Sequence, residues 1–384
     1  MAFLRNDAVN RVNVHSGVQA LAKGAGGLFV LVFLLQAGLS IPAVLLAQAA
    51  IQIGRFLIRP AILPLAMRWG LKPLLIAGAL GLALPYIVLA EVQGVGPALI
   101  VLCVAVSLGE VFYWVSYNSY FAAIGDAEHR GHQIGAREAL TAAAGIIAPL
   151  LGAWALVSVG PRWTFVAVGL LQAAAALPLL GLPNVSIASN APGAYRSARP
   201  AVVVSALDGW LDACLLVLWP MVLFLTLGRS FAAYGGAMAL AALAGAAGAL
   251  WLGRRIDGGF GRRAVVVAYV LAAATVVAQA VSVGAPWLAV AANAMGALLM
   301  PLLSPAIGGV TYNLAKRSPC PLRFTMASEG GWDMGCAAAC LVAAAMVAGG
   351  ASLAAALLLG LPSVLAGALW LWRLYPGVVR PAPA

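Results

Sequence analysis

The stretch Gly253–Arg263, G-R-R-I-D-G-G-F-G-R-R, indicates the fold because it is a short basic loop between two long apolar runs. Its four arginines surround a single aspartate, and its glycines allow the chain to turn tightly. A fainter copy, L-A-M-R-W-G-L-K-P-L-L, lies at Leu65–Leu75. Basic residues in a short loop between apolar segments place that loop on the cytoplasmic side of a membrane. Two such loops at matching positions indicate a membrane protein built from two duplicated halves.

The composition indicates a chain that lies almost entirely in a membrane. Of its 384 residues, 64% are hydrophobic and only 9% are charged, whereas a soluble domain carries about 25% charged residues. At about 20 residues per membrane helix, this length holds about twelve spans and no sizeable soluble domain. The net charge of +11 is concentrated in short loops between spans, which argues against nucleic acid as a partner. The five cysteines are scattered, and we interpret them as buried apolar residues without disulfides.

Twelve apolar spans can be placed along the chain, joined by short connections. We expect them at 13–38, 42–67, 72–90, 97–123, 137–159, 163–182, 201–227, 231–252, 264–283, 287–314, 324–348 and 353–374. Among the basic residues between spans, only Arg162 and Arg229 fall on the outer side, so both termini are expected to be cytoplasmic. We interpret the polar segment 183–200 as a cytoplasmic linker between an N-terminal half, 1–182, and a C-terminal half, 201–384.

The paired loops resemble the signature of the major facilitator superfamily of secondary transporters, which lies between helices 2 and 3 and again between helices 8 and 9. The matching residues are Gly253, Asp257, Gly261, Arg262 and Arg263 in the second copy and Arg68, Gly70 and Lys72 in the first. The resemblance implies an all-α integral membrane fold of twelve helices in two pseudo-symmetric halves, with these loops gating the conformational change. In the first copy, Met67 stands where the family has an aspartate that helps to latch the halves together.

Charged residues inside the spans are the candidate site residues, because a charge at membrane depth costs at least about 2.5 kcal/mol and needs a reason. They fall in spans 1, 2, 4, 5, 7 and 11, whereas the interiors of spans 3, 6, 9 and 12 carry none. In the superfamily the third helix of each three-helix repeat is peripheral and the others line a central cavity. The distribution of charge therefore matches the fold that the resemblance implies.

Most charges at membrane depth in the N-terminal half are cationic, and we expect them to hold an anionic group of a solute. Lys23 continues a polar stripe of span 1 that also contains His15 and Gln19. The candidate substrate-binding residues of this half are Lys23, Arg55, Arg59, Glu110, Tyr113 and Tyr117. Alternatively, Glu110 is an internal partner of the two arginines, Lys23 and His15 reach the interface by snorkelling, and the aromatic side chains only pack.

The charges at membrane depth in the C-terminal half are acidic. Asp208 and Asp212 lie one helical turn apart in span 7, and so do Glu329 and Asp333 in span 11. Two carboxylates one turn apart cannot both be ionised at low cost in a low-dielectric setting, which suits a proton carrier. We expect all four to take part in proton coupling, and the two aspartates of span 7 also to contact substrate. The alternative is that the charges of the chain pair with each other and only orient the helices.

The function expected from these observations is secondary active transport of a small organic solute, anionic or zwitterionic, by alternating access and with proton coupling. Two alternatives stay open: an exporter of amphipathic drugs or lipids, and a non-transporting membrane sensor or scaffold. The expected partners are the lipid bilayer, the solute and protons, for a monomer without cofactors in a bacterial inner membrane. The sequence has no phosphate-binding loop, nucleophile elbow or metalloprotease helix, so an ATP-driven pump and an intramembrane protease have no support.

Overall fold

The computed structural model of the chain describes residues 6–124, 130–253 and 262–379. The regular structure of this part is entirely helical, and twelve of its helical segments are long and apolar enough to cross a membrane. They run over Asp7–Gln36, Ile41–Trp69, Leu71–Leu89, Pro97–Phe121, Ala139–Ser158, Pro161–Gly181, Ala194–Thr226, Phe231–Leu250, Arg262–Val281, Pro286–Lys316, Pro321–Ala348 and Leu353–Tyr375. The expected all-α fold of twelve membrane helices is confirmed.

Two compact units make up the chain, the first from Met1–Leu39 with Gly54–Ala191, the second from Ser40–Ile53 with Pro192–Ala384. Helix α10 (Ala194–Asp212) begins inside the linker expected at 183–200, after Gly193 with its φ of 82°. Span 7 is expected to begin at residue 201, after Pro200, and proline lacks the amide hydrogen of a helix interior. It is nevertheless accommodated within α10, where its carbonyl accepts a 3.3 Å hydrogen bond from the indole of Trp370.

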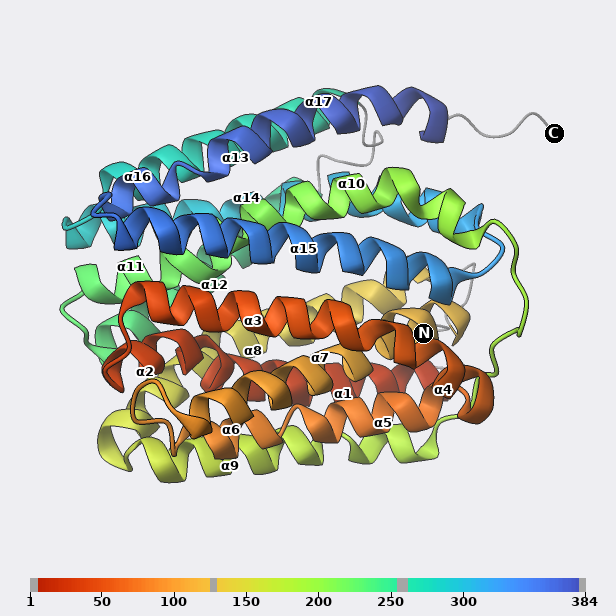
Figure 1. The fold of residues 1–384 in the computed structure, drawn as a ribbon, viewed down its shortest axis with the longest axis horizontal. Helices are drawn as coiled ribbons and strands as arrows, with labels where there is room; N and C mark the ends of the chain where they lie inside the picture. Colours follow the sequence, from red (N-terminus) through yellow and green to blue (C-terminus); the bar gives the residue numbers. More distant parts are fainter. Residues whose placement is uncertain (1–5, 125–129, 254–261, 380–384) are drawn as a thin grey trace. The chain divides into compact units, whose positions relative to one another are not determined.

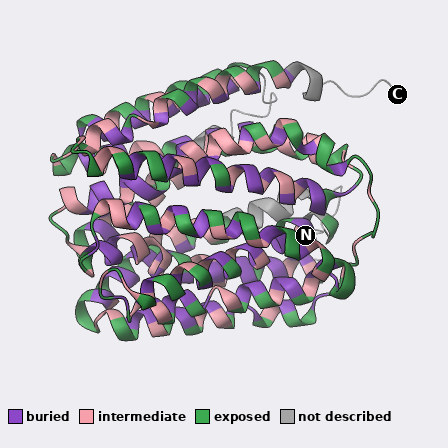
Figure 2. Ribbon diagram, viewed as in Figure 1, coloured by how far each residue is buried: buried purple, intermediate pink, exposed green. Residues whose placement is uncertain are grey.

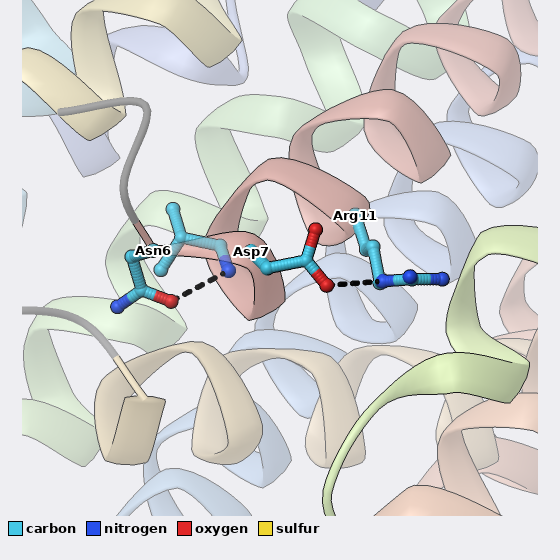
Figure 3. Close-up of polar contacts among 4 residues, drawn as sticks. Asn6, Asp7 and Arg11 are labelled. Carbon is cyan, nitrogen blue, oxygen red and sulfur yellow. Dashed lines mark hydrogen bonds and ion pairs between the residues drawn. The ribbon is translucent and has the colours of Figure 1, made fainter. Parts of the chain in front are cut away.

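The first unit begins with a capped helix. Its helices are α1 (Asp7–Ala25), η2 (Gly27–Phe29), α2 (Val30–Gln36), η3 (Arg59–Ala61), α4 (Ile62–Trp69), α5 (Leu71–Gly81), α6 (Leu84–Leu89), α7 (Pro97–Ile124), α8 (Arg130–Ser158), α9 (Pro161–Ala174) and η4 (Leu177–Gly181). The side chain of Asn6 accepts a 3.1 Å hydrogen bond from the amide of Val9, and Asp7 pairs with Arg11 at 2.7 Å (Figure 3). An N-cap of this kind satisfies a free amide of the first turn, so span 1 begins before residue 13.

Small residues allow the helices of the first unit to approach closely. A Cβ atom at Gly152 of α8 would overlap the carbonyl oxygen of Ala25 in α1. A Cβ atom at Gly78 of α5 would overlap the backbone of Tyr113 in α7. These two glycines therefore bring α1 against α8 and α5 against α7 at backbone distance.

The second unit contains the same kind of glycine contact. Its helices are α10, η5 (Ala213–Leu218), α11 (Trp219–Thr226), α12 (Phe231–Gly253), α13 (Arg262–Val281), α14 (Pro286–Lys316), α15 (Pro321–Ala348), α16 (Leu353–Leu357) and α17 (Gly360–Val379). Helices α10 and α15 lie side by side along their length (Figure 1). A Cβ atom at Gly335 would overlap the carbonyl oxygen of Ala206, and one at Gly209 would overlap that of Trp332. Contact at this distance places the side chains of α10 and α15 within reach of each other.

Buried, intermediate and exposed residues alternate around most helices (Figure 2). Many of the exposed side chains are large and apolar, for example Trp287, Leu250 and Val281. Such a surface suits contact with lipid rather than water. The five cysteines are free thiols and four of them are buried, which confirms their interpretation as apolar residues.

Candidate substrate and proton site

Arg55 and Glu110 of the first unit form an ion pair near the middle of their spans. Arg55 lies on α3 (Ile41–Ile58) and Glu110 on α7, and Nη1 of the arginine is 3.5 Å from Oε2 of the glutamate. The arginine side chain is 8% exposed and the glutamate side chain 28%. Internal pairing, which the sequence left open as an alternative, is therefore present for these two residues. Arg59, one turn beyond Arg55, is also buried.

The close approach of α3 and α7 positions this ion pair. A Cβ atom at Gly54 would lie 2.6 Å from the hydroxyl oxygen of Ser107, one turn before Glu110. The Ser107 hydroxyl in turn donates a 2.8 Å hydrogen bond to the carbonyl of Cys103. Glycine at position 54 thus allows the two helices to lie close enough for Arg55 to reach its partner.

A hydrogen-bonded chain joins α1 to α7 one turn further along α7. The hydroxyl of Tyr113 lies 2.8 Å from Nε2 of His15 and 2.5 Å from Oε1 of Gln19. Nδ1 of His15 lies 2.6 Å from the carbonyl oxygen of Ala175. His15 is fully buried, and both of its ring nitrogens have partners. The alternative that His15 snorkels to the membrane interface is therefore wrong.

Aromatic side chains of α7 extend this chain along the helix. The ring of Tyr117 stacks on that of Tyr113 with centroids 5.4 Å apart, and its hydroxyl lies 2.9 Å from Oγ of Ser16. Trp114 packs edge-on against Tyr113 at 5.0 Å. The predicted residues Tyr113 and Tyr117 are thus both buried and hydrogen-bonded to α1, and Trp114 is left partly exposed beside them.

Lys23 differs from Arg55 and Arg59, the buried cations of the first unit, because it is exposed. Its Nζ lies 5.5 Å from the centroid of the Trp114 ring, a distance that allows a cation–π interaction. Within the described part of the chain no carboxylate lies within 4 Å of it. Lys23 lies near the middle of the span Asp7–Gln36, about 15 Å from either edge of a 30 Å hydrocarbon core. That distance disfavours snorkelling.

The acidic residues of the second unit that the structure describes lie on α10 and α15, which pack closely against each other. The indole Nε1 of Trp332 donates a 3.0 Å hydrogen bond to Oδ2 of Asp212. Asp333, the next residue of α15, is fully buried, whereas Asp208, Asp212 and Glu329 are partly exposed. The indole of Trp332 therefore connects the acidic segment of α10 to that of α15.

The chain changes its helical winding directly after Asp212. The segment η5 (Ala213–Leu218) is π-helical, and α11 (Trp219–Thr226) follows with Pro220 in its first turn. Proline has no amide hydrogen to donate to the carbonyl four residues earlier, which favours a wider turn before it. Segments of π-helix occur often at functional sites, and this one adjoins a candidate proton carrier.

The expected gating loop of the first half turns at Gly70, whose φ of 81° is a conformation that favours glycine. Asn184 holds this loop in place. Its Nδ2 donates to the carbonyl of Trp69 at 2.8 Å, and its Oδ1 accepts from the amide of Lys72 at 3.2 Å. A residue of the segment after span 6 therefore fixes the loop in which Met67 replaces the superfamily's aspartate.

The gating loop of the second half is described only at its end. Asp257 and Gly261 lie outside the described residues. The guanidinium carbon of Arg262 lies 4.9 Å from the ring centroid of Trp372, and Arg263 is exposed. Arg68 of the first loop similarly lies 5.9 Å from the ring of Trp69. Each loop thus places an arginine over a tryptophan, a contact typical of guanidinium groups.

Several residues that contact the predicted ones were not predicted as site residues themselves: His15, Gln19, Trp332 and Asn184. His15 and Gln19 do have a sequence signal, the polar stripe of span 1. Trp332 lies beside Asp333 in the sequence, which hints at a shared site. Asn184 has no chemical signal beyond its place at the end of span 6.

Twelve segments that are long and apolar enough to cross a membrane define the chain as an integral membrane protein. It belongs to the major facilitator superfamily. A sequence profile described as Major Facilitator Superfamily matches residues 17–204, which include most of span 1, spans 2 to 6 and the start of span 7. The resemblance seen in the paired loops is thus confirmed. No curated protein matches the chain.

Proposed function

We propose that this transporter is a secondary active transporter that moves a small anionic or zwitterionic organic solute by alternating access, coupled to protons. The observation that supports this most directly is the exposure of Lys23 near the middle of its span. A lysine at that depth is too costly to face hydrocarbon, so its exposed side must face water. A water-filled route at mid-membrane depth is what a solute transporter needs.

The chemistry of the two units supports a solute that carries a negative group. Lys23 has no carboxylate within 4 Å among the described residues and is free to bind one from a solute. Trp114 beside it offers an apolar face. Arg55 is already neutralised by Glu110, so it contributes less attraction for an anion. We therefore propose Lys23 as the principal anchor of the solute's anionic group.

Proton coupling is proposed for the second unit on the basis of Asp208. Asp208 is partly exposed near mid-span, and no hydrogen bond or ion pair to it occurs among the described residues. Asp212, one turn away, accepts a hydrogen bond from Trp332. A donor to one carboxylate stabilises its charge, which leaves the neighbouring carboxylate as the one that takes up a proton more readily. Asp212, Glu329 and Asp333 remain candidates to share or relay this proton.

A ligand screen followed by a flux assay tests the proposal. Purified protein is screened by thermal shift against metabolites and drugs at two pH values, because a ligand of the folded state raises apparent stability. We expect a class of anionic or zwitterionic compounds to stabilise the wild type, and Lys23→Gln to abolish the shift. Arg11→Gln, which removes an exposed cation near the start of span 1, is the matched control and should leave it unchanged.

The coupling part of the proposal is tested in liposomes with a compound identified by the screen. We expect a pH gradient to drive its accumulation by the wild type, and Asp208→Asn to exchange solute without responding to the gradient. A wild type whose flux ignores the gradient contradicts proton coupling. If no compound stabilises the protein at either pH, a sensor or scaffold becomes the better interpretation.

The proposed orientation has the N- and C-termini in the cytoplasm of a bacterium, with the chain as a monomer in the inner membrane. It is supported by the distribution of basic residues, of which only Arg162 and Arg229 lie between spans on the proposed outer side. Single cysteines introduced at Arg162 and at Asn190, in a variant without the five native cysteines, test it. A membrane-impermeant thiol reagent added to whole cells should label the first and spare the second.

A further inference from the structure

The buried histidine of α1 carries an inference beyond the carboxylates of the second unit. His15 is fully buried and is hydrogen-bonded through both ring nitrogens. Nδ1 faces the carbonyl oxygen of Ala175 at 2.6 Å. A carbonyl oxygen can only accept, so Nδ1 carries a hydrogen atom. The protonation state of His15 therefore depends on Nε2 alone.

The partner of Nε2 can act in either direction. The Tyr113 hydroxyl, 2.8 Å from Nε2, can donate to a neutral imidazole or accept from an imidazolium. The same hydroxyl lies 2.5 Å from Oε1 of Gln19, which can only accept. If the single hydroxyl hydrogen is used toward Gln19, Nε2 must supply a hydrogen of its own. The arrangement around Tyr113 is thus the hydrogen-bond pattern of a protonated His15.

A second pattern fits the same atoms after loss of one proton. The Tyr113 hydroxyl then donates to Nε2, and the amide of Gln19 turns over so that its nitrogen donates to the Tyr113 oxygen. The proton leaves from Nε2, no bond between heavy atoms changes, and both ring nitrogens of His15 and the hydroxyl of Tyr113 keep their partners. In the protonated state the nitrogen of the Gln19 amide points away from Tyr113, and in the neutral state its oxygen does. Gln19 lies one helical turn from Lys23.

We propose that His15 is a proton-binding site of the first unit, and that Tyr113 transmits its protonation state to Gln19. The link between this proton site and transport rests on the proposed proton coupling. It places one proton at the imidazole of α1, on the helix that carries the solute anchor Lys23. Proton uptake at His15 turns the amide of Gln19 and so changes the polarity offered to a solute held by Lys23.

Few other ionisable groups face His15. From the elements packed against α1, the described titratable or charged side chains are Cys103, Glu110, Tyr113, Tyr117 and Tyr120 of α7 and the exposed Arg162 at the start of α9. The described side chains of α8, Ala139–Ser158, and those of η4 include no charged residue. Helix α1 itself adds Asp7, Arg11 and Lys23. Glu110 is paired with Arg55, so the hydrogen bonds of His15 are its principal local interactions.

Nitrogen-15 spectra of histidine-labelled protein test the proton site directly. The chain has three histidines, so His129→Gln and His132→Gln leave His15 as the one observed. In full-length protein in lipid nanodiscs, titrated from about pH 4 to pH 8, we expect both ring nitrogens to be protonated at the low end and only Nδ1 at the high end. A single form over this whole range, or a neutral form protonated at Nε2, would overturn the inference.

Two variants test the role of Tyr113. Tyr113→Phe removes the hydroxyl and should move the titration midpoint by on the order of one pH unit. Tyr117→Phe is the matched control, since the Tyr117 hydroxyl contacts Ser16 instead, and it should leave the midpoint nearly unchanged. Equal midpoints in the wild type and Tyr113→Phe would contradict the transmission to Gln19. Thermal unfolding of each variant confirms that the titrating protein is folded.

The test separates this inference from the proposed function. If His15 titrates as expected and the wild-type flux ignores a pH gradient, the proton site stands and the proposed coupling fails. If flux follows the gradient and His15 keeps one form, this inference fails and coupling stays with the carboxylates. If both hold, His15→Gln should reduce the response of flux to the gradient while solute exchange continues.

Discussion

The two units pack their helices alike and treat their buried polar groups differently. In the first, α1 meets α8 at Gly152, and in the second, α10 meets α15 at Gly335, with backbone against backbone in both. The polar side chains of α1 are linked through His15, Tyr113 and Gln19 into a continuous hydrogen-bonded chain. The candidate proton carriers of α10 are carboxylates, one of which, Asp212, accepts a hydrogen bond from an indole.

This difference suggests that the two units have different roles in handling protons. A chain of side chains that both donate and accept can change the direction of its hydrogen bonds without breaking contact. A carboxylate that meets only a donor can change its charge but not reverse its bond. We infer that the first unit is suited to transmit a protonation state, and the second to hold or release charge.

The largest expected effect concerns the ion pair of the first unit. Glu110→Gln removes the charge that Glu110 places beside the buried Arg55 and should destabilise the protein by about 2–3 kcal/mol, less than for a fully buried pair because Glu110 is partly exposed. Chemical denaturation in detergent micelles measures this. Glu91→Gln, which breaks the exposed 3.9 Å contact with Arg162, is the control and should change stability by less than about 0.5 kcal/mol. Equal losses would mean that burial of Arg55 carries no cost.

The next effect tests the shared packing of the two units. Exchange of a helical glycine for alanine normally stabilises by about 0.5–1 kcal/mol. At Gly335 the added methyl group meets the Ala206 carbonyl, so Gly335→Ala should instead destabilise by about 1–3 kcal/mol. Gly152→Ala should do the same in the first unit. The control is Gly308→Ala, where nothing lies within 4 Å of the new Cβ. If all three variants gain thermal stability, the close crossings are wrong.

A smaller effect distinguishes the indole that meets a carboxylate from one that meets a backbone carbonyl. Trp332→Phe removes the donor to Asp212 and should cost about 1.5–3 kcal/mol, the range of hydrogen bonds to charged groups. Trp210→Phe removes a 2.8 Å bond to the Leu359 carbonyl and should cost about 0.5–1.5 kcal/mol. In an Asp212→Asn background the two losses should become similar. Similar losses already in the wild-type background would show that Asp212 carries no charge there.

The smallest expected effect concerns the gating loop of the first half. Asn184→Ala removes the side chain that bonds Trp69 and Lys72 and should cost about 1 kcal/mol locally. Hydrogen exchange of the Lys72 amide should then become about fivefold faster. Asn190→Ala, at an exposed position of the same segment, is the control and should leave this exchange rate unchanged. An unchanged rate in Asn184→Ala would assign the order of the loop to Gly70 and to the hydrogen bond between the Leu71 amide and the Val185 carbonyl.

The sequence predicts the fold well because membrane spans depend on long apolar runs, which can be read without tertiary contacts. Glycine at position 70 likewise predicts a turn, and its φ of 81° confirms it. The start of span 7 is less predictable, since Pro200 normally argues against a helix interior. In the structure α10 begins before it, at Ala194.

The candidate site is predicted only as a set of residue types. Charge at membrane depth identifies Lys23, Arg55 and Asp208 without any structure, because the cost of burial is a general one. It does not predict that Arg55 pairs with Glu110, or that Asp212 accepts a hydrogen bond from Trp332. Such pairings depend on helix rotation and side-chain rotamers. Whether these residues bind solute or carry protons stays a prediction for the experiments above.

The contacts of Asn184 also bear on where the chain can be engineered. Asn184 belongs structurally to the loop at Gly70, although it follows the last helix of the first unit. A split of the gene into two fragments, or insertion of a fluorescent domain, upstream of this asparagine would separate the loop from its support. Residues 190–193, of which Asn190, Pro192 and Gly193 are exposed, lie beyond it and before α10. They are the place where a cut or a fusion leaves both neighbouring structures whole.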